Sequence, residues 1–251
     1  MRIDILTLFP ESIEAFLSES ILGRARKKGT VEIVCRQIRD YTLNRQKQTD
    51  DYPYGGGYGM VMYADALYNA HRSVLEECGR EHVHTVYLSP QGQLFDEDKA
   101  KELAGYDQIV LVCGHYEGVD ERFLEECVDE EISLGNFVLT GGEIAAAAVT
   151  DAVARLVPGV LRTEECFTDE SLYDGRLEHP QYTRPEEWHG KCVPEVLLSG
   201  DHEKIRRWRK RQGLLRTFDK RPDLFEEFPL SEEEKTILRE EGRDPEGSGK
   251  P

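Results

Sequence analysis

The chain has 251 residues, of which 49 are acidic and 32 basic, giving a net charge of −17, and 39% of its residues are hydrophobic. This length can bury one large domain core or two modest ones, and the composition argues against an intrinsically disordered protein. No apolar run reaches the roughly 18 to 20 residues of a membrane helix, and Pro10 and Glu11 come too early for a signal peptide, so we expect a cytoplasmic protein.

The first 160 residues alternate strand-like and helix-like segments. Short apolar runs, rich in β-branched residues and bounded by turn residues, predict buried strands at 3–9, 31–38, 83–88, 109–113 and 132–139. Helical patterns occur at 65–77, 96–104, 120–127 and 143–157. This order is a βαβ repeat, which predicts an α/β fold with a mainly parallel sheet covered on both faces.

The pattern changes after residue 160. Residues 161–182 are polar and lack sustained periodicity, which is typical of an interdomain linker or a mobile functional loop. A basic helical pattern and then an acidic one at 231–241 predict a small helical domain that ends in a frayed tail. We therefore expect three parts, at residues 1–160, 161–182 and 183–251.

Positive charge is concentrated at residues 204–221, although the chain as a whole is acidic. This segment holds nine basic residues and one acid, so its net charge of +8 leaves −25 on the rest of the chain. A cationic stripe that includes Trp208 is typical of an electrostatic docking face. We interpret it as a contact to an RNA backbone, the alternative being a solvated helix face.

The spacing of cysteine and histidine does not indicate a metal site or a disulfide framework. The six cysteines contain no C-x-x-C pair, and the seven histidines form no H-E-x-x-H pattern. We therefore expect reduced structural thiols and no metal bound by the protein.

Three glycine-containing segments follow three of the predicted strands: LSPQG at 88–92, CGHYEG at 113–118 and LTGGE at 139–143. Because the carboxyl ends of parallel strands form the ligand crevice of an open sheet, we expect these segments to converge on one site. Glycine permits close backbone approach, which lets a loop hold an adenine or a ribose. The glycine-rich segment 53–60 lacks the last glycine of G-x-G-x-x-G, and no P-loop motif occurs, which disfavours ordinary NAD and ATP folds.

Seven further motifs occur together, in this order and spacing, in one known family. They are DDYPYGGGYGM at 50–60, YLSPQG at 87–92, LVCGHYEGVDER at 111–122, DEEISLGNFVLTGGE at 129–143, VARLVPGVL at 153–161, HPQYTRP at 179–185 and VPEVLLSGDHEKIRRWR at 193–209. With these motifs the chain resembles the bacterial tRNA (guanine-N1)-methyltransferase family, TrmD, up to about residue 225.

The resemblance implies a SPOUT-superfamily fold. In that fold, the end of the N-terminal domain threads through a trefoil knot, a small helical domain follows, and two protomers form a homodimer with a shared active site. It also implies that S-adenosyl-L-methionine is the methyl donor and is held in the knot. Similar enzymes are associated with magnesium, for which this sequence offers no ligand cluster. The residues implied to bind the cofactor are Tyr87, Leu88, Ser89, Pro90, Gly114, Glu117, Leu134, Gly135, Leu139, Gly141 and Gly142.

The implied reaction is methyl transfer to N1 of the guanosine 3′ of the anticodon, at tRNA position 37. The product is 1-methylguanosine, which supports maintenance of the reading frame. That ring nitrogen carries a proton at neutral pH, so the reaction needs a base to remove it. It also needs a cation or donor to hold the charge that grows on the neighbouring carbonyl oxygen. In similar proteins an arginine stands just before P-G-V-L, which here is Arg155, and the alternative is a helix-capping arginine.

The base is ambiguous in this sequence. The family pattern has an aspartate immediately before a serine in the linker, and that place is occupied here by Glu170, with Asp169 one residue earlier. We favour Asp169, because a flexible loop can slip by one residue. The longer side chain of Glu170 is the alternative, and a slow enzyme is a third.

The resemblance also implies residues that contact the tRNA in the anticodon arm. Tyr58 stands where proline is frequent in the family, and His115 stands where arginine also occurs. The alternatives are that Tyr58 is a packing residue and that His115 is a polar loop residue. The full set is Asp51, Gly55, Gly56, Gly57, Tyr58, His115, Arg184, Arg206, Arg207 and Arg209.

Two other functions remain open. A non-catalytic RNA-binding module on a SPOUT scaffold would have no chemical need for the intact glycine loops, Arg155 and a linker carboxylate. A SPOUT methyltransferase acting on another RNA or on a small molecule would leave the basic segment and HPQYTRP unexplained.

Overall fold

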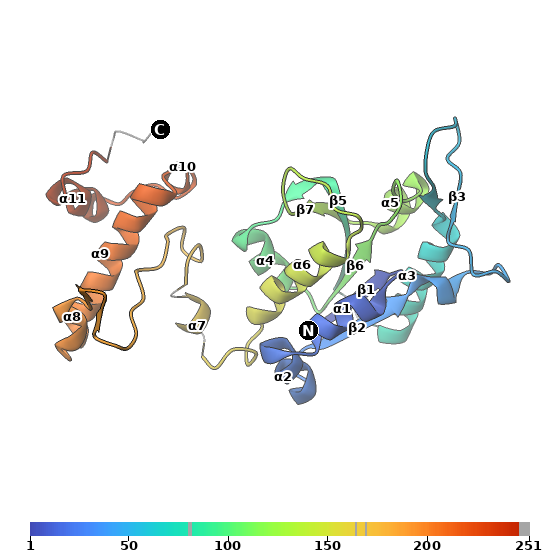
Figure 1. The fold of residues 1–251 in the computed structure, drawn as a ribbon. Helices are drawn as coiled ribbons and strands as arrows, with labels where there is room; N and C mark the ends of the chain where they lie inside the picture. The colour runs from blue at the N-terminus through green and yellow to red at the C-terminus, as the bar shows by residue number, and fades with distance from the viewer. Residues whose placement is uncertain (80–81, 164, 169, 246–251) are drawn as a thin grey trace. The chain divides into compact units, whose positions relative to one another are not determined.

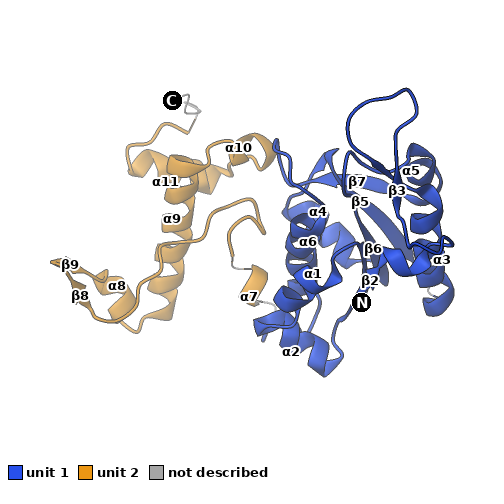
Figure 2. Cartoon of the chain, turned by 45° about the vertical axis from the view of Figure 1, so that its right-hand side comes forward, with its two compact units in different colours: residues 1–164 blue, residues 165–251 orange. Residues whose placement is uncertain are grey.

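The chain forms two compact units, Met1–Glu164 and Glu165–Pro251, coloured separately in Figure 2. The computed structural model describes residues 1–79, 82–163, 165–168 and 170–245. Within these residues, no helix is long and apolar enough to cross a membrane. Unit 1 is an α/β structure and unit 2 is mainly helical (Figure 1).

Unit 1 is built on a five-stranded sheet in the order β2-β1-β6-β5-β7, in which every pair of neighbours is parallel. The strands are β1 (Arg2–Thr7), β2 (Glu32–Gln37), β5 (Val83–Leu94), β6 (Gln108–Cys113) and β7 (Glu130–Ser133). The central strands β1 and β6 are buried along their whole length, because both faces of the sheet are covered. The predicted α/β fold with a mainly parallel sheet is confirmed.

Helices cover both faces of this sheet, and alternate residues of β6 show the two sides. Ile109 and Leu111 belong to the core that includes α1, α2, α4 and α6, whereas Val110 and Val112 pack with η1, α3 and α5. This alternation follows from the two-residue period of a strand. The helices are α1 (Pro10–Leu17), α2 (Ser20–Lys28), η1 (Ile38–Tyr41, a 3-10 helix), α3 (Ala64–Cys78), α4 (Glu97–Ala104), α5 (Glu121–Cys127) and α6 (Glu143–Arg155).

Local sequence signals set several helix boundaries. The side chain of Asp96 accepts a hydrogen bond from the backbone N–H of Lys99 at the start of α4, and Asp120 accepts from Arg122 N–H at the start of α5. At the other end of a helix, Gly29 adopts φ +72° after α2, a conformation that a side chain would strain.

The structure corrects two of the expected element bounds in unit 1. The strand predicted at 132–139 ends at Ser133, because Gly135 turns the chain at φ +149°. The apolar residues that follow, such as Phe137 and Val138, are 54% and 82% exposed rather than buried in a sheet. The segment 88–92, predicted as a loop, continues strand β5 with a register shift between Leu88 and Gln93.

A short hairpin that sequence periodicity did not predict frames the glycine-rich segment. Strand β3 (Asp50–Asp51) pairs antiparallel with β4 (Val61–Met62), and residues 53–60 connect them. Figure 1 shows this connection extending away from the sheet.

Unit 2 contains short elements around the long helix α9. Leu214 and Leu215 of α9 form its core with Leu238 of α11. The guanidinium of Arg176 donates to both carboxylate oxygens of Glu234, at 2.9 and 3.2 Å. The basic and acidic helical patterns predicted from the sequence correspond to α9 and α11. The elements are α7 (Glu165–Thr168), β8 (Glu187–Trp188), β9 (Lys191–Cys192), α8 (Glu195–Leu198), α9 (His202–Lys220), α10 (Leu224–Glu227) and α11 (Glu232–Glu240).

Candidate active site

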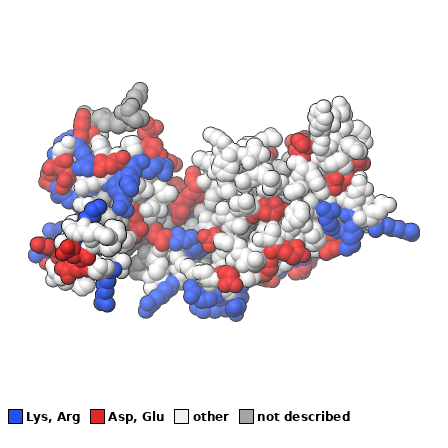
Figure 3. All heavy atoms as spheres, in the orientation of Figure 1, with Lys and Arg blue, Asp and Glu red and all other residues white. Residues whose placement is uncertain are grey.

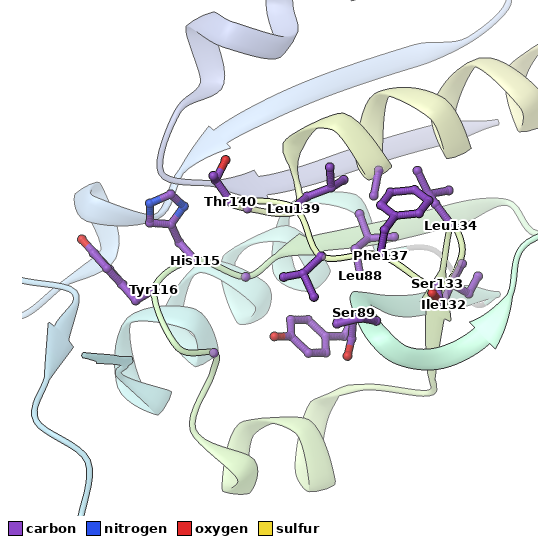
Figure 4. A pocket seen from close by; sticks show the side chains of 18 of the residues that line it. Leu88, Ser89, His115, Tyr116, Ile132, Ser133, Leu134, Phe137, Leu139 and Thr140 are labelled. Carbon is purple, nitrogen blue, oxygen red and sulfur yellow. The ribbon is translucent and has the colours of Figure 1, made fainter. Parts of the chain in front are cut away.

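A cavity of about 160 Å³ lies where β6 ends, where β5 stops pairing with β6 at Leu88, and where the loop between β7 and α6 folds back (Figure 4). It is lined by residues 87–90, 114–118, 132–134 and 137–142 and by Ala145. Because parallel strands end at one edge of the sheet, the three glycine-containing segments meet here. Ten of the eleven residues predicted to bind a cofactor line the cavity. Gly135 belongs to the same loop but is not one of the lining residues.

Glycines allow the walls of this cavity to approach one another. A Cβ on Gly114 would lie 2.6 Å from the phenol oxygen of Tyr87, and a Cβ on Gly142 would lie 2.7 Å from Cα of Cys113. Because neither residue has a side chain, the two loops come close enough for the backbone N–H of Gly142 to donate to the carbonyl of Gly114 at 3.0 Å. A side chain at either position would force these loops apart.

The cavity wall is mostly apolar, with backbone groups and few charges. Leu88, Leu139 and Phe137 contribute apolar surface, as Figure 4 shows. Burial raises the pKa of Tyr87 to about 12, so its phenol stays a neutral hydrogen-bonding group at physiological pH. Glu117 is the one carboxylate among the described lining residues. Such a wall suits a flat heterocycle with polar edges and a positively charged group.

The hairpin β3–β4 is attached to the rim of the cavity. Met62 N–H donates to the carbonyl of Gly118 at 2.9 Å, and Glu117 N–H donates to the carbonyl of Met60 at 3.0 Å. A Cβ on Gly59 would lie 2.4 Å from Cγ of Glu117, so the glycine-rich segment lies directly against this carboxylate.

The residues of this hairpin predicted to contact tRNA are held in an exposed turn. Gly55, Gly56 and Gly57 adopt φ of +87°, +80° and +132°, which favours glycine, and the side chain of Tyr58 is 98% exposed. Asp51 accepts a hydrogen bond from the phenol of Tyr63 at 3.3 Å. The hairpin therefore presents an aromatic side chain and a backbone of three successive glycines to solvent next to the cavity.

His115 lies on the wall of the cavity, and its Nδ1 atom is buried without a hydrogen-bond partner among the described residues. Its ring lies 5.1 Å from that of Phe9 and 4.9 Å from that of Tyr116. A Cβ on Gly141 would meet both His115 Nδ1 and Oε2 of Glu143, at 2.8 and 2.3 Å. Sequence reasoning missed Glu143, although it ends the LTGGE motif.

The carboxylate of Glu143 is fixed from the side of β1. Thr7 Oγ1 donates to its Oε1 at 2.7 Å, which leaves Oε2 toward Gly141. A buried imidazole nitrogen and a carboxylate thus face the same glycine at the edge of the cavity.

The structure does not bring Arg155 to the cavity of its own chain. Arg155 ends α6, whereas Gly142 and Ala145 line the cavity at the start of this helix. The ten residue steps from Ala145 to Arg155 span about 15 Å of helix. If Arg155 acts at a cavity of this kind, that cavity is not the one at the start of its own helix.

Of the two candidate bases, only one falls within the described residues. Glu170 is partly buried in unit 2, where it lines a separate cavity with Arg206 and Arg209. Asp169 lies outside the described residues.

The basic helix α9 carries less unpaired charge than the sequence indicated. Arg206 and Arg207 pair with Glu203 at 2.9 and 3.0 Å, and Lys210 pairs with Glu233 of α11 at 3.0 Å. Figure 3 shows Lys and Arg interspersed with Asp and Glu over unit 2. These pairs are exposed and contribute little to stability, so a phosphate can replace the carboxylate.

Arg184 and Arg209 lie together in unit 2. Both line a cavity beside Tyr182, whose ring lies 6.4 Å from that of Trp208. In the part of unit 2 that the structure describes, no carboxylate forms an ion pair with Arg209.

No group of three or more His, Cys, Asp or Glu side chains is arranged to hold a metal ion within the residues that the structure describes.

Comparison with known proteins assigns a family to this arrangement. The family model of tRNA (Guanine-1)-methyltransferase TrmD matches residues 1–227. A tRNA (guanine-N(1)-)-methyltransferase of Clostridium perfringens is 53% identical over 239 residues, covering 95% of this chain and 99% of the relative. Proteins of the same name from Ruminiclostridium cellulolyticum and Staphylococcus epidermidis are 51% and 49% identical. They align with 91% and 95% of this chain, and with 98% and 96% of their own lengths.

Proposed function

The chain belongs to the TrmD tRNA (guanine-1)-methyltransferase family, and from this premise we propose that it methylates N1 of the guanosine 3′ of the anticodon, at tRNA position 37. The product is 1-methylguanosine, which supports reading-frame maintenance. The observation that carries the proposal is the glycine-walled cavity, which is formed by the same segments that carry the family motifs.

The cavity fits S-adenosyl-L-methionine, the donor that the family implies. A Cβ on Gly114 or Gly142 would collide with neighbouring atoms, which leaves backbone groups accessible, and Phe137 and Leu139 offer an apolar wall to an adenine. Glu117 places a carboxylate near a positively charged ligand. When bound, the donor supplies an electrophilic methyl group on a sulfonium.

We assign a SPOUT trefoil knot to the polypeptide around this cavity. Support comes from the close return of the loop after β7 onto the loop after β6, where His115 and Gly141 form an isolated antiparallel bridge. The hydrogen bond from Gly142 N–H to the carbonyl of Gly114 holds the same two segments together.

Arg155 and a linker carboxylate carry out the chemistry on the guanine. The guanidinium holds the charge that develops on the carbonyl oxygen of the base, and Asp169 or Glu170 removes the proton from N1. The remaining contribution is alignment of the nitrogen with the methyl group, which the two loops fix by their backbone.

These groups are supplied by a second protomer. Because Arg155 lies about 15 Å along α6 from Ala145, which lines the cavity of its own chain, we propose a homodimer in which each cavity receives Arg155 and the linker carboxylate from its partner. Residues 161–182 act as the linker that carries the acid.

The tRNA is held by both units. Arg184, Arg206, Arg207 and Arg209 contact phosphates of the anticodon arm, and the hairpin carrying Tyr58 contacts the region of the target base. A guanine stacked in a helix is out of reach, so the base is extruded and read on its edges.

The test is direct measurement of the product. Purified protein is incubated with S-adenosyl-L-methionine and unmodified tRNA transcripts, with and without magnesium, and the nucleosides are analysed by mass spectrometry. We expect 1-methylguanosine from transcripts with guanosine at position 37 and none from transcripts with adenosine there. Binding of tRNA without any methylated product would favour the non-catalytic module. Methylation of ribosomal RNA alone would favour another substrate.

A further inference from the structure

Arg39, in η1, carries a guanidinium that makes only weak contacts to neutral groups. Its Nη1 donates to Oγ1 of Thr49 and its Nη2 to the phenol oxygen of Tyr116, both at 3.5 Å. These distances are at the long limit of a hydrogen bond. Among the described residues, no carboxylate lies within ion-pair distance of this guanidinium.

Several other arginines of unit 1 that are shielded from solvent form ion pairs with carboxylates. Arg2 pairs with Asp4 at 2.6 Å and Arg26 pairs with Glu14 at 2.6 Å. The carboxylate next in sequence to Arg39, that of Asp40, is engaged by Lys47 at 2.6 Å. In a chain of net charge −17, a partly buried arginine without an acidic partner is available to bind an external anion.

The position of Arg39 is defined by its two contacts. Thr49 directly precedes β3, the first strand of the glycine-rich hairpin, and Tyr116 lines the rim of the cavity. Tyr116 adopts φ +59°, and Figure 4 shows its hydroxyl pointing away from Leu88 and Phe137. Arg39 therefore lies outside the cavity, between its rim and the hairpin.

We propose that Arg39 and the phenol of Tyr116 bind a phosphate of the tRNA backbone that flanks the target guanosine. This inference rests on the function proposed above. An extruded nucleotide keeps a phosphate on each side, so a base that enters the cavity brings an anion to its rim. The guanidinium offers two N–H groups in a planar fork, and the phenol can donate its own proton to a phosphate oxygen while it accepts from Arg39.

The test compares Arg39→Gln with Arg72→Gln, which removes the same charge from an exposed arginine on α3 that pairs with Glu76. The dissociation constant of tRNA is measured between 50 and 200 mM KCl for the full-length protein, and that of S-adenosyl-L-methionine by calorimetry. For Arg39→Gln we expect about 10-fold weaker tRNA binding, and a slope of log affinity against log salt that is shallower by about 0.7 to 0.9. We expect S-adenosyl-L-methionine to bind as in the wild type.

Arg39→Lys serves as a second variant, since it keeps the charge and loses the fork. It should retain the salt slope of the wild type and recover part of the affinity for tRNA. A salt slope and an affinity in Arg39→Gln equal to those of Arg72→Gln would overturn the proposal. So would a loss of S-adenosyl-L-methionine binding, because Arg39 would then hold the donor's carboxylate.

Formation of 1-methylguanosine by the wild type separates the two proposals. If the wild type forms the product and Arg39→Gln binds tRNA normally, only the phosphate contact is wrong. If the wild type forms no product, the proposed function is wrong.

Discussion

A Cβ atom on Gly114 would lie 2.6 Å from the phenol oxygen of Tyr87, so the loop after β6 can pack this closely against β5 only if it carries glycine at this position. Tyr87 is buried and cannot swing aside without opening the sheet edge that it covers. The shape of the cavity therefore depends on the absence of a single methyl group.

We expect Gly114→Ala to weaken binding of S-adenosyl-L-methionine at least about 10-fold, since the loop must move away from Tyr87. Calorimetric titration measures this. Gly105→Ala is the control, because Gly105 ends α4 at φ −78° and its added methyl group meets only a carbonyl oxygen at 3.2 Å. Equal affinities for the two variants would contradict this account of the cavity wall.

Arg155→Ala should lower kcat about 10²- to 10³-fold and leave the affinity for S-adenosyl-L-methionine unchanged, because the proposed role of the guanidinium is to stabilise charge that develops only during the reaction. The same assay assigns the base by comparing Asp169→Asn with Glu170→Gln. One of the two should lose most of its activity. Full activity in both would show that neither carboxylate removes the proton.

Two impaired variants should restore activity when they are mixed, at a concentration of S-adenosyl-L-methionine too low to fill the cavity of Gly114→Ala. A dimer of one Arg155→Ala chain and one Gly114→Ala chain has one site with an intact cavity and an intact arginine. Random exchange should therefore recover about one quarter of the wild-type rate. The rate is measured after the two proteins are unfolded and refolded together. No recovery, in a mixture shown to contain the mixed dimer, would place Arg155 and the cavity of one site on the same chain.

The sequence predicted the sheet and its ligand edge well, because β5 and β6 contain short runs rich in β-branched residues and the segments after Leu88 and Cys113 carry glycine. It failed at Phe137 and Val138, where an apolar run looks like a strand but lines a cavity after the turn at Gly135. Hydrophobicity alone does not distinguish these two uses of apolar residues.

Charges posed a different problem for sequence reasoning. The net charge of +8 was counted within residues 204–221 alone. It therefore left out Glu233 and Glu240 of α11, which form ion pairs with basic residues of α9. Arg39 was not predicted as a binding residue. Its lack of an acidic partner depends on which carboxylates are near it in space, and the sequence does not show this.

Stability should fall as the pH decreases from 7 to 5, in part because of His71. Burial lowers the pKa of this imidazole below its usual 6.5, opposed by the charge of Asp129. Between the lowered folded-state pKa and 6.5, the unfolded chain binds the proton and the folded chain does not. This contribution is therefore present above pH 6.5 and is lost as the pH falls through the folded-state pKa.

His71→Gln should flatten this part of the profile, since glutamine does not titrate and can still contact Thr85, which lies 2.9 Å from the imidazole Nε2. The free energy of unfolding in urea is measured at intervals of half a pH unit for both proteins. Identical slopes between pH 5 and 7 would show that His71 does not contribute.

Asp4 is fully buried in β1 and accepts four hydrogen bonds from three side chains. Arg2 donates at 2.6 and 3.0 Å, Arg36 at 2.9 Å and Gln108 at 2.8 Å. Loss of this carboxylate leaves two guanidinium groups facing an uncharged amide inside the protein. Removing one partner of a buried ion pair costs about 3 to 5 kcal/mol, and the carboxylates that remain beside these arginines, Glu32 and Glu77, are half exposed and compensate the charge only in part.

We therefore expect Asp4→Asn to lower the free energy of unfolding by about 3 kcal/mol, measured in urea at pH 7. Glu77→Gln is the matched control, since Glu77 contacts the same two arginines but has a side chain that is 53% exposed, and its loss should be below about 1 kcal/mol. The cluster contacts the first residues of β1 and β6, whereas the cavity lies where β6 ends. Folded Asp4→Asn should therefore bind S-adenosyl-L-methionine like the wild type. If the two variants lose equal stability, burial is not what makes the Asp4 cluster important.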